Sequence, residues 1–218
     1  MHLLKKFKEY LQKENLFQIK DRLLIAVSGG VDSVVLCELT ARAGFRFIIA
    51  HCNFQLRGLE SFGDQKFVQD YAEANSIPVF VTQFDTEAFA KDYKLSTQVA
   101  ARELRYSWFY ELLEIKKFDF ILTAHHADDN LETFIINLTR GTGISGLHGI
   151  LPRRDRLIRP LLFLNRQEIN EVVNENDLSF VEDSSNLSTN YTRNKIRLEV
   201  IPHLQEINPN LEKTSSQV

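Results

Sequence analysis

The first two-thirds of the chain alternates short apolar runs with longer amphipathic segments. Four apolar runs of strand length read RLLIAV from Arg22, FRFIIA from Phe45, PVFVTQ from Pro78 and FDFILTA from Phe118. Apolar residues recur at helical spacing in the segments between and after them, residues 32–43, 60–75, 97–116 and 128–139. The alternation predicts βαβ units, and therefore an α/β fold with a parallel twisted sheet and helices on both of its faces.

The pattern changes after Arg140. Residues 141–160 are rich in Gly and Pro and predict a loop that crosses the edge of the sheet. Residues 165–176 predict a helix capped by Asn165 with Glu168 three positions later, and residues 190–204 predict another helix that stops near Pro202. We therefore expect an α/β domain over residues 1–150 and a small helical extension over residues 151–218.

Three polar stretches follow three of the predicted strands. They read SGGVDS, HCNFQLRG and HHADDN. In a parallel sheet the carboxyl ends of the strands lie at one edge, where ligands of open α/β sheets bind. We therefore expect the three stretches to meet at one site.

The stretch SGGVDS has the composition of a phosphate-binding turn. It comprises Ser28, Gly29, Gly30, Val31, Asp32 and Ser33. Adjacent glycines let backbone N–H groups approach an anion, and the helix that follows presents its positive end. The serine hydroxyls can donate hydrogen bonds, and Asp32 is a candidate magnesium ligand. The stretch lacks the lysine of the P-loop motif GxxxxGK[ST], and it does not fit GxGxxG, the motif of dinucleotide-binding sites. The alternative to a phosphate site is a tight turn that binds no ligand.

The stretch HHADDNLET places two carboxylates on one helix face. Asp129 and Glu132 are three residues apart, and His125 precedes them by about one turn. Paired carboxylates suit an ammonium group or a metal ion, although the spacing is not HExxH and no third histidine is evident for zinc. An acidic start of a helix, stabilised by the helix dipole, is the alternative for Asp128.

Arginines are grouped at three further places. Arg102 and Arg105 lie three apart on one predicted helix, and Arg193 and Arg197 lie four apart on another, where they suit phosphate or are ordinary surface charges. Between residues 140 and 166, six arginines and one aspartate give a local charge of +5, which leaves −8 for the rest of the chain. Such a segment can contact RNA phosphates, or it is a solvated loop.

Composition narrows the class of protein. Of 218 residues, 44% are hydrophobic and 25% charged, as in a globular protein, and no apolar run approaches the ~20 residues of a membrane span. The N-terminal residues lack the features of a signal peptide. The two cysteines, Cys37 and Cys52, do not form a disulfide framework or a CxxC site, so we expect a cytoplasmic protein with no membrane contact.

The motifs together resemble a known family. SGGVDS resembles the SGGxDS loop of the PP-loop ATP pyrophosphatases. AVSGGVDSVVL, HCNFQLRG, AARELRY, LTAHHADDNLET, NLTRGTGISGLHGI, IRPLL and FVEDSSNLSTNYTRNKIR occur in the order and spacing of the tRNA(Ile)-lysidine synthetases, over about residues 20–205. The resemblance implies an adenine nucleotide alpha hydrolase-like fold. It also implies a ligase in which ATP adenylylates the 2-oxygen of the wobble cytidine of a tRNA(Ile) with a CAU anticodon, and lysine then displaces AMP to give lysidine.

The resemblance also implies roles for individual residues. Residues 28–33 would bind ATP, with Asp32 near Mg²⁺. Asp129 and Glu132 would hold L-lysine, and His125, Arg105 and Arg197 would lie near the adenylate or the lysine. Residues 140–159 would contact the tRNA, and a homodimer is left open.

The chain departs from the family at two points. Phe54 stands where the second motif usually has a second histidine, so any role of that histidine is in doubt here. The chain also ends before the C-terminal domains of larger members, as a catalytic-domain fragment or a minimal form would.

Three other functions compete with this one. A tRNA thiolase or an amidotransferase-type enzyme of the same fold would share the phosphate loop, but a thiolase generally needs cysteines placed to carry sulfur or a cluster. A non-catalytic ATP-binding module would bind ATP without releasing AMP. A general RNA-binding protein would leave the phosphate loop unexplained.

Overall fold

A computed structural model describes residues 2–143, 148–182, 192–211 and 214. The first half contains α1 (His2–Lys13), β1 (Leu23–Ala26), α2 (Val31–Arg42), β2 (Phe47–Asn53), α3 (Leu59–Ala74), β3 (Val79–Gln83), α4 (Thr86–Asp92) and α5 (Thr97–Lys116). The second half contains β4 (Phe120–Leu122), α6 (Ala127–Thr139), β5 (Arg153–Arg154), β6 (Leu157–Ile158), α7 (Arg166–Asn176), α8 (Thr192–Lys195), the π-helical turn η3 (Ile196–Val200) and α9 (Ile201–Ile207).

The strands form a single mostly parallel sheet. Their order is β3-β2-β1-β4-β6-β5, and only the pairing of β5 with β6 is antiparallel. The strand order reverses between β1 and β4, because the chain runs from β1 outward to β3 and then returns to the other side of β1. This switch point is where an open α/β sheet offers a binding crevice.

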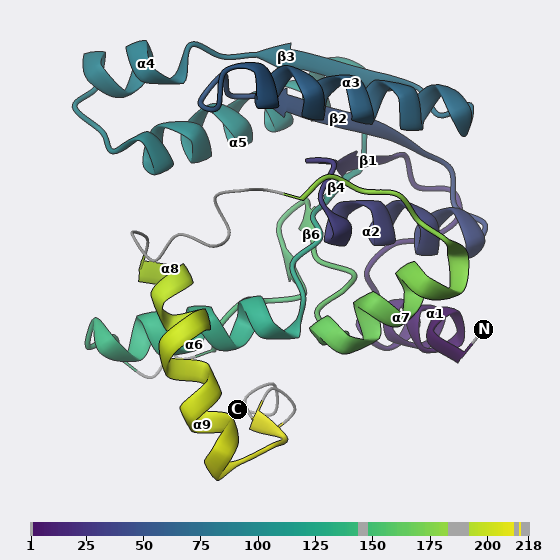
Figure 1. Cartoon of the computed structure of the whole chain (residues 1–218). Coiled ribbons are helices and arrows are strands. Elements are labelled where there is room, and N and C mark those ends of the chain that lie inside the picture. The colour runs from purple at the N-terminus through teal and green to yellow at the C-terminus, as the bar shows by residue number, and fades with distance from the viewer. Residues whose placement is uncertain (1, 144–147, 183–191, 212–213, 215–218) are drawn as a thin grey trace.

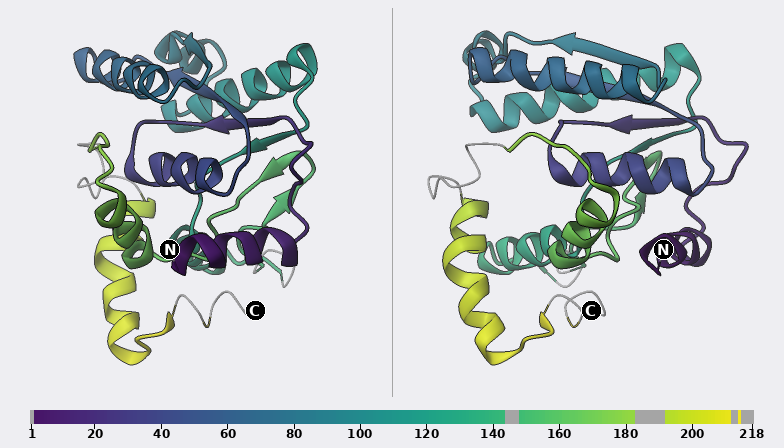
Figure 2. Two further views of the ribbon diagram at one scale, coloured as in Figure 1. Left: turned by 90° about the vertical axis from the view of Figure 1, so that its right-hand side faces the viewer. Right: turned by 45° about the vertical axis from the view of Figure 1, so that its right-hand side comes forward.

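Alternate residues of β1 serve the two faces of the sheet. Leu23 and Ile25 belong to a core with α1, α2, α3 and α7, whereas Leu24 belongs to a second core with α5. Figures 1 and 2 show α5 on one side of the sheet and α2 on the other, with α1 and α7 packed against α2. The predicted fold class, with helices on both faces, is confirmed.

The predicted helices agree closely with the observed ones. α5 spans Thr97–Lys116 as predicted, and the Ser96 hydroxyl accepts a hydrogen bond from the backbone N–H of Val99 at its start. At the start of α7, Asn165 and Glu168 exchange side-chain-to-backbone hydrogen bonds in the predicted capping box. α4 was not predicted, because its seven residues are too few to show a helical period.

Two predictions in the C-terminal third are wrong in detail. Residues 153–158 are not a loop, because β5 and β6 form a hairpin that extends the sheet beside β4. The helix of residues 190–204 does not stop near Pro202. Pro202 instead lies in the first turn of α9, where a missing N–H is tolerated, and the preceding turn widens to the π-helix η3. Residues 144–147 and 190–191 of these two predictions lie outside the described residues.

A third apolar cluster joins α6 to the C-terminal helices. Leu131, Ile135 and Ile136 of α6 pack with Ile196 of η3 and Ile201 of α9, apart from the two cores of the sheet. Figure 1 shows α6, α8 and α9 together at the lower left, beside the sheet. β6 and α7 belong instead to the sheet and its core, and the division of the chain at residue 150 stays a prediction.

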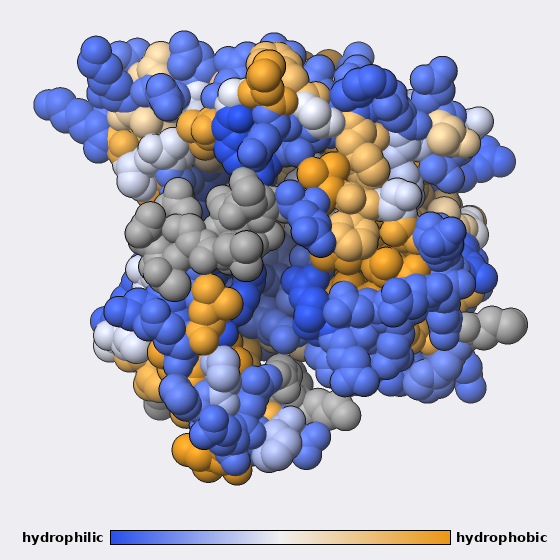
Figure 3. Space-filling view, in the orientation of Figure 1, coloured by the Kyte–Doolittle hydropathy of each residue, from blue (hydrophilic) through white to orange (hydrophobic). Residues whose placement is uncertain are grey.

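The face of the molecule drawn in Figure 3 is largely hydrophilic. In Figure 3 apolar side chains gather mainly in a strip over α2, between α3 and α7. Phe67 and Tyr71 of α3 stack on each other and are only partly buried against the core beneath. None of the described helices combines the length and the apolar character that crossing a membrane requires.

Candidate active site

Hydrogen bonds to the Ser28 and Ser33 hydroxyls fix the backbone of the turn between β1 and α2. This turn, residues 28–33, is called the phosphate turn below. Gly29 has φ +97°, and its N–H donates to the Ser33 hydroxyl at 3.2 Å. The Gly30 N–H lies 3.3 Å from the Ser28 hydroxyl, and the Ser33 hydroxyl donates to the Gly30 carbonyl at 2.8 Å. α2 begins at the next residue, Val31. Backbone N–H groups, two hydroxyls and a helix N-terminus therefore converge, as a phosphate site requires.

A second segment buttresses this turn from outside. The Val181 N–H donates to the Gly29 carbonyl at 3.0 Å. A Cβ atom at Gly29 would come within 3.3 Å of the Phe67 ring and 3.4 Å of Val68. The backbone conformation and the close packing both favour glycine at this position.

The turn opens on a cavity of about 350 Å³ at the carboxyl ends of β1, β2 and β4. All three predicted stretches contribute to its wall, with Ser28 from the first, Cys52 from the second and His125 from the third. Arg105 of α5, Asp129 of α6 and Arg193 of α8 also line it. The expected convergence of the three stretches on one site is confirmed.

His125 is a neutral imidazole in this wall. Its Nδ1 lies 3.0 Å from the Thr123 hydroxyl. Burial lowers the pKa of His125 to about 4, and the positive charges of Arg159 and Arg193 act in the same direction, against the opposing effect of Asp129. His125 therefore carries no charge near neutral pH.

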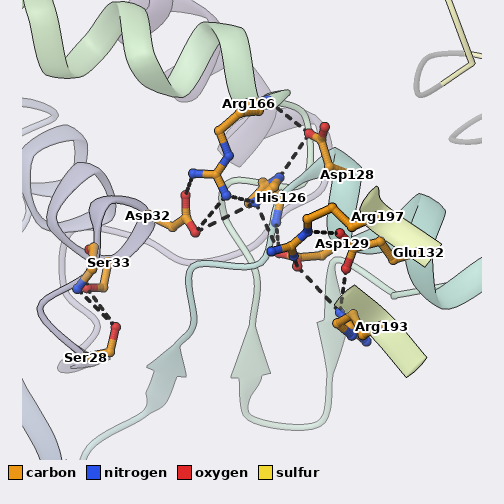
Figure 4. A network of polar contacts seen from close by, with 11 residues as sticks. Ser28, Asp32, Ser33, His126, Asp128, Asp129, Glu132, Arg166, Arg193 and Arg197 are labelled. Atoms are coloured by element: carbon orange, nitrogen blue, oxygen red, sulfur yellow. Dashed lines mark hydrogen bonds and ion pairs between the residues drawn. The ribbon is translucent and has the colours of Figure 1, made fainter. Parts of the chain in front are cut away.

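Asp32 is paired with an arginine from the far half of the chain. The Arg166 guanidinium contacts the two Asp32 oxygens at 2.6 and 3.2 Å, as Figure 4 shows. The Arg166 backbone N–H also donates to Asp128 at 2.9 Å. The N-terminus of α7 is thereby fixed to both the phosphate turn and the start of α6.

The buried ring of His126 lies at the centre of this network. Its Nδ1 is 3.1 Å from Asp128, and its Nε2 is 3.0 Å from the Arg166 guanidinium and 3.5 Å from Asp129. Burial alone would lower the pKa of His126, but the hydrogen bond to Asp128 and the charges of Asp129 and Asp32 raise it above its usual value.

Two arginines of the C-terminal helices neutralise the carboxylates of α6. Arg197 donates to Glu132 at 2.5 Å, and Arg193 lies 3.4 Å from Glu132 and 3.5 Å from Asp129 (Figure 4). Glu132 has no solvent exposure, and neither Glu132 nor Arg197 lines the cavity. Asp129 and Arg193 are therefore the members of this cluster that line the cavity and can contact a ligand.

The two carboxylates differ in their tendency to ionise. Burial favours the neutral form of both. At Asp129 the imidazoles of His126 and His125, a backbone N–H and Arg193 outweigh burial and lower the pKa. At Glu132 burial outweighs the hydrogen bond and charge of Arg197, so its pKa is raised. Asp129 is therefore the stronger negative centre at the cavity.

Comparisons with known proteins place the chain in a family. Residues 1–204 match the sequence family described as "PP-loop domain". A tRNA(Ile)-lysidine synthase from Bacteroides thetaiotaomicron is 47% identical over 205 residues, which cover 94% of this chain and 48% of that protein. One from Petrotoga mobilis is 37% identical over 214 residues, which cover 96% of this chain and 68% of that protein.

The chain belongs to the tRNA(Ile)-lysidine synthase family. It spans about half the length of several curated relatives that it matches, including the Bacteroides protein. The match includes the phosphate turn, α6 and most of the described C-terminal helices, so the cavity as a whole lies within the shared region.

A solved structure supports the fold. The U34-tRNA thiolase from Methanococcus maripaludis, solved with its [4Fe-4S] cluster, superposes with a TM-score of 0.76 at 17% identity. The superposition covers 98% of this chain and 77% of the thiolase chain. At this level of identity the likeness shows a common fold and nothing about the reaction.

The cysteines of this family member differ from those a sulfur carrier needs. Cys37 is fully buried within α2, and burial raises its pKa. Cys52 lines the cavity, but burial raises its pKa to about 12, so its thiol is a weak nucleophile at neutral pH. Among the described residues no group of three or more His, Cys, Asp or Glu is arranged to hold a metal ion.

The predicted site residues fall into three groups. Ser28, Gly30, Asp32, Ser33, Arg105, His125 and Asp129 line the cavity. Glu132 and Arg197 lie behind it, where they support Asp129 and Arg193. Gly29 and Val31 shape the turn without lining the cavity.

Sequence reasoning missed Arg166 and His126. In the sequence Arg166 is only one member of a basic segment, 134 positions from its partner Asp32. Its place directly after the Asn165 cap was a usable signal, because the N-terminus of a helix that follows the sheet tends to lie at the same edge. His126 carries no signal of its own beyond being the neighbour of His125.

The basic segment is less exposed than its charge suggested. Arg166 pairs with Asp32, Arg156 with Glu114, and Arg159 is buried. Arg140, Arg153 and Arg154 remain exposed, and Arg153 also lies over the Phe120 ring at 4.8 Å. These three arginines are the part of the segment that can meet a polyanion.

Proposed function

We propose that this chain carries out the ATP-dependent formation of lysidine at the wobble cytidine of a tRNA(Ile) with a CAU anticodon. One observation supports this more than any other. The phosphate turn and the anionic Asp129 lie on the wall of the same cavity, in a chain of the tRNA(Ile)-lysidine synthase family.

The first step is adenylylation of the base. The 2-oxygen of cytidine attacks the α-phosphorus of ATP, and the bond to the bridging oxygen of pyrophosphate breaks. Pyrophosphate carries away the electron pair, and the turn of residues 28–33 offers it the Ser28 and Ser33 hydroxyls and the N-terminus of α2. Arg105 and Arg193, both on the cavity wall, stabilise the negative charge that spreads over the phosphate oxygens.

The second step is attack by lysine. The ε-amine, once unprotonated, attacks C2 of the activated base, the C2–oxygen bond breaks with its electron pair on AMP, and the amine loses a proton to solvent. Asp129 attracts the lysine ammonium into place. Its contact with Arg193 is long, at 3.5 Å, and can be exchanged for an ammonium group. The neutral His125 contributes hydrogen bonding without repelling the incoming cation.

Magnesium fits one end of the cavity. Asp32 lines the cavity within the phosphate turn, and Mg²⁺ is commonly held by one or two carboxylates together with substrate phosphates. When bound, the ion would neutralise charge on the β- and γ-phosphates. Asp32 would then share its charge between the ion and Arg166.

The remaining partners are part of the same proposal. The exposed Arg153 and Arg154 are suited to tRNA phosphates. A homodimer and a cytoplasmic location stay predictions. The regions of the longer relatives that this chain does not span would add contacts to tRNA.

The test follows labelled lysine into RNA. Purified protein is incubated with Mg-ATP, radiolabelled lysine and either tRNA(Ile) with a CAU anticodon or tRNA(Met). We expect label in tRNA(Ile) alone, with one AMP released for each lysine incorporated. Asp129→Asn should reduce the incorporation at least tenfold, because it removes the charge that attracts the ammonium group.

A matched control is Asp70→Asn, which alters an exposed carboxylate of α3 outside the cavity. It should leave incorporation unchanged. If the protein places no label in tRNA(Ile) under these conditions, the proposed function is wrong.

A further inference from the structure

A second cavity adjoins the first at the end of β2. It measures about 510 Å³, within the range of about 300–1,000 Å³ typical of small-molecule sites. Its wall comes largely from the stretch HCNFQLRGLES and the start of α5. The adenylylation chemistry leaves most of that stretch without a role.

The two cavities share a wall. Ser28, Cys52, Phe54 and Arg105 line both of them. The Arg105 guanidinium lies over the Phe54 ring at 5.0 Å, and Phe54 stacks on Phe84 with ring centroids 5.8 Å apart. Phe54 and Arg105, with Phe84 stacked on Phe54, therefore form a flat surface at the boundary that the two cavities share. Such surfaces are where proteins receive unstacked RNA bases.

A buried histidine in the second cavity has an unused hydrogen-bonding atom. His51 is 3% exposed, and its Nδ1 lies 2.8 Å from the Val27 carbonyl, so Nδ1 carries the proton and donates. Burial lowers the pKa of His51, although the Val27 carbonyl and Asp64 oppose this, so the ring is neutral. Nε2 is then an acceptor, and it has no partner among the described residues.

The rest of the lining is polar and close to neutral overall. Arg57 and Asp64 form an ion pair, and the charges of Glu87 and Arg105 balance each other. Asn53 and Gln98 add amide groups. A lining of this kind suits a neutral, flat ligand with several polar edges, rather than a strongly charged one.

We propose that the second cavity receives the target cytosine of the RNA, with its exocyclic amine donating to His51 Nε2 and its ring against the Phe54–Arg105 wall. This inference rests on the proposed function. It deepens that function by assigning the base its own site, next to the cavity that takes ATP. The shared wall brings the 2-oxygen of a base in the second cavity toward a nucleotide in the first.

The assignment explains selection of cytosine over uracil. Uracil presents a carbonyl oxygen where cytosine presents an amine. Two acceptors, Nε2 and that oxygen, would then face each other in a buried place, which disfavours uracil because both atoms stay unpaired. The protein should therefore bind a cytosine-containing loop about tenfold more tightly than its uracil counterpart.

The decisive variant is His51→Asn. The shorter amide can still donate to the Val27 carbonyl, but it removes the acceptor at the position of Nε2. Binding of an RNA stem-loop with the anticodon CAU is compared with that of a UAU stem-loop by fluorescence anisotropy, with Mg²⁺ and a non-hydrolysable ATP analogue present. We expect the preference for CAU to fall to about twofold or less in His51→Asn.

A second variant keeps the proposal testable if His51→Asn folds poorly. Phe54→Leu removes the flat surface and should weaken binding of both stem-loops about tenfold, while the preference for CAU is retained. The control is Phe62→Leu, at an exposed ring of α3 outside both cavities. It should bind as the unmodified protein does.

The outcomes separate this inference from the proposed function. If the unmodified protein incorporates lysine while both variants bind the two stem-loops as it does, the base site is elsewhere and the inference fails alone. If His51→Asn weakens lysine binding and leaves the CAU preference intact, the cavity holds lysine and the inference also fails. If the unmodified protein does not act on RNA at all, the proposed function and the inference fall together.

Discussion

Glu132 is a fully buried carboxylate balanced by arginines from a different part of the chain. Its oxygens meet Arg197 at 2.5 Å and Arg193 at 3.4 Å. Burial of the pair is not in itself evidence of stability, because desolvation costs about as much as the attraction returns. The ionised form of Glu132 nevertheless depends on Arg197 and Arg193 for its stabilisation.

The first prediction is that Arg197→Met lowers the free energy of unfolding by about 3 kcal/mol at pH 8, because the buried carboxylate of Glu132 loses its closest partner. The pKa of Glu132, already raised by burial, should rise further. A carboxyl with a raised folded-state pKa binds protons more readily when folded, so the loss should shrink as the pH falls toward 5.

Denaturant unfolding at both pH values measures this effect. Lys195→Met, which alters the exposed last residue of α8, two positions before Arg197, should cost less than about 0.5 kcal/mol. A loss for Arg197→Met that is small, or that grows as the pH falls, would contradict the account of Glu132.

The second prediction concerns His125. Its pKa is about 4 when folded against an ordinary value near 6.5, so the unfolded chain takes up a proton first as the pH falls. This contribution to stability is therefore complete above pH 6.5 and is lost progressively toward pH 4, by at most about 3 kcal/mol. His125→Gln should flatten the stability profile in that window, and unfolding curves at pH 4.5–7.5 measure it. The exposed His203→Gln should leave the profile unchanged, and a similar flattening in both variants would count against the assignment.

Single residues show clearly what a sequence can and cannot reveal. Asp129 and His125 were found because they lie four residues apart in one motif at the end of a strand. Arg193, which lowers the pKa of both, and Arg159, which lowers that of His125, come from segments further along the chain. Only tertiary packing brings them together, so residue spacing could not show that Glu132 and Arg197 would lie behind the cavity wall.

At the scale of elements, the turn between β1 and α2 depends on a glycine. The third prediction is that Gly29→Ala lowers stability by about 1–2 kcal/mol and weakens ATP binding, because its φ is positive and its Cβ would press on Phe67. Gly63→Ala is the matched control. Gly63 lies within α3 with open space around it, so alanine there should stabilise the protein by about 0.5–1 kcal/mol.

Thermal unfolding and ATP titration of the two variants decide this prediction. Equal stability of both variants would mean that the turn does not require a left-handed residue. Loss of stability with unchanged ATP affinity would mean that the turn does not bind ATP.

Elements with a full hydrophobic period could be predicted, and short ones could not. β1 to β4 and the helices α2, α3, α5, α6 and α7 follow from apolar spacing and caps. β5 and β6 have two residues each and form because the edge of β4 is available beside them. The continuation through Pro202 depends on the wider π-helical turn before it, which has no sequence signature of its own.

At the scale of the whole molecule, only three arginines of the basic segment of residues 140–166 are exposed among the described residues: Arg140, Arg153 and Arg154. The fourth prediction is that Arg153→Gln combined with Arg154→Gln weakens tRNA binding and lowers the slope of log K against log salt by roughly 2. Lys5→Gln combined with Lys66→Gln removes the same charge from exposed positions on α1 and α3. Filter binding from 50 to 200 mM salt measures both, and an equal effect of the two double variants would show only a general dependence on charge.

The central claim is that this cavity activates an RNA oxygen with ATP, and one measurement addresses it directly. Protein is mixed with ATP labelled at the α-phosphate, Mg²⁺ and tRNA(Ile) with a CAU anticodon, without lysine, and the RNA is digested to locate the label. We predict label on the wobble cytidine that is released as AMP when lysine is added. Label that appears on lysine in the absence of RNA, or pyrophosphate release that does not depend on RNA, would contradict the account.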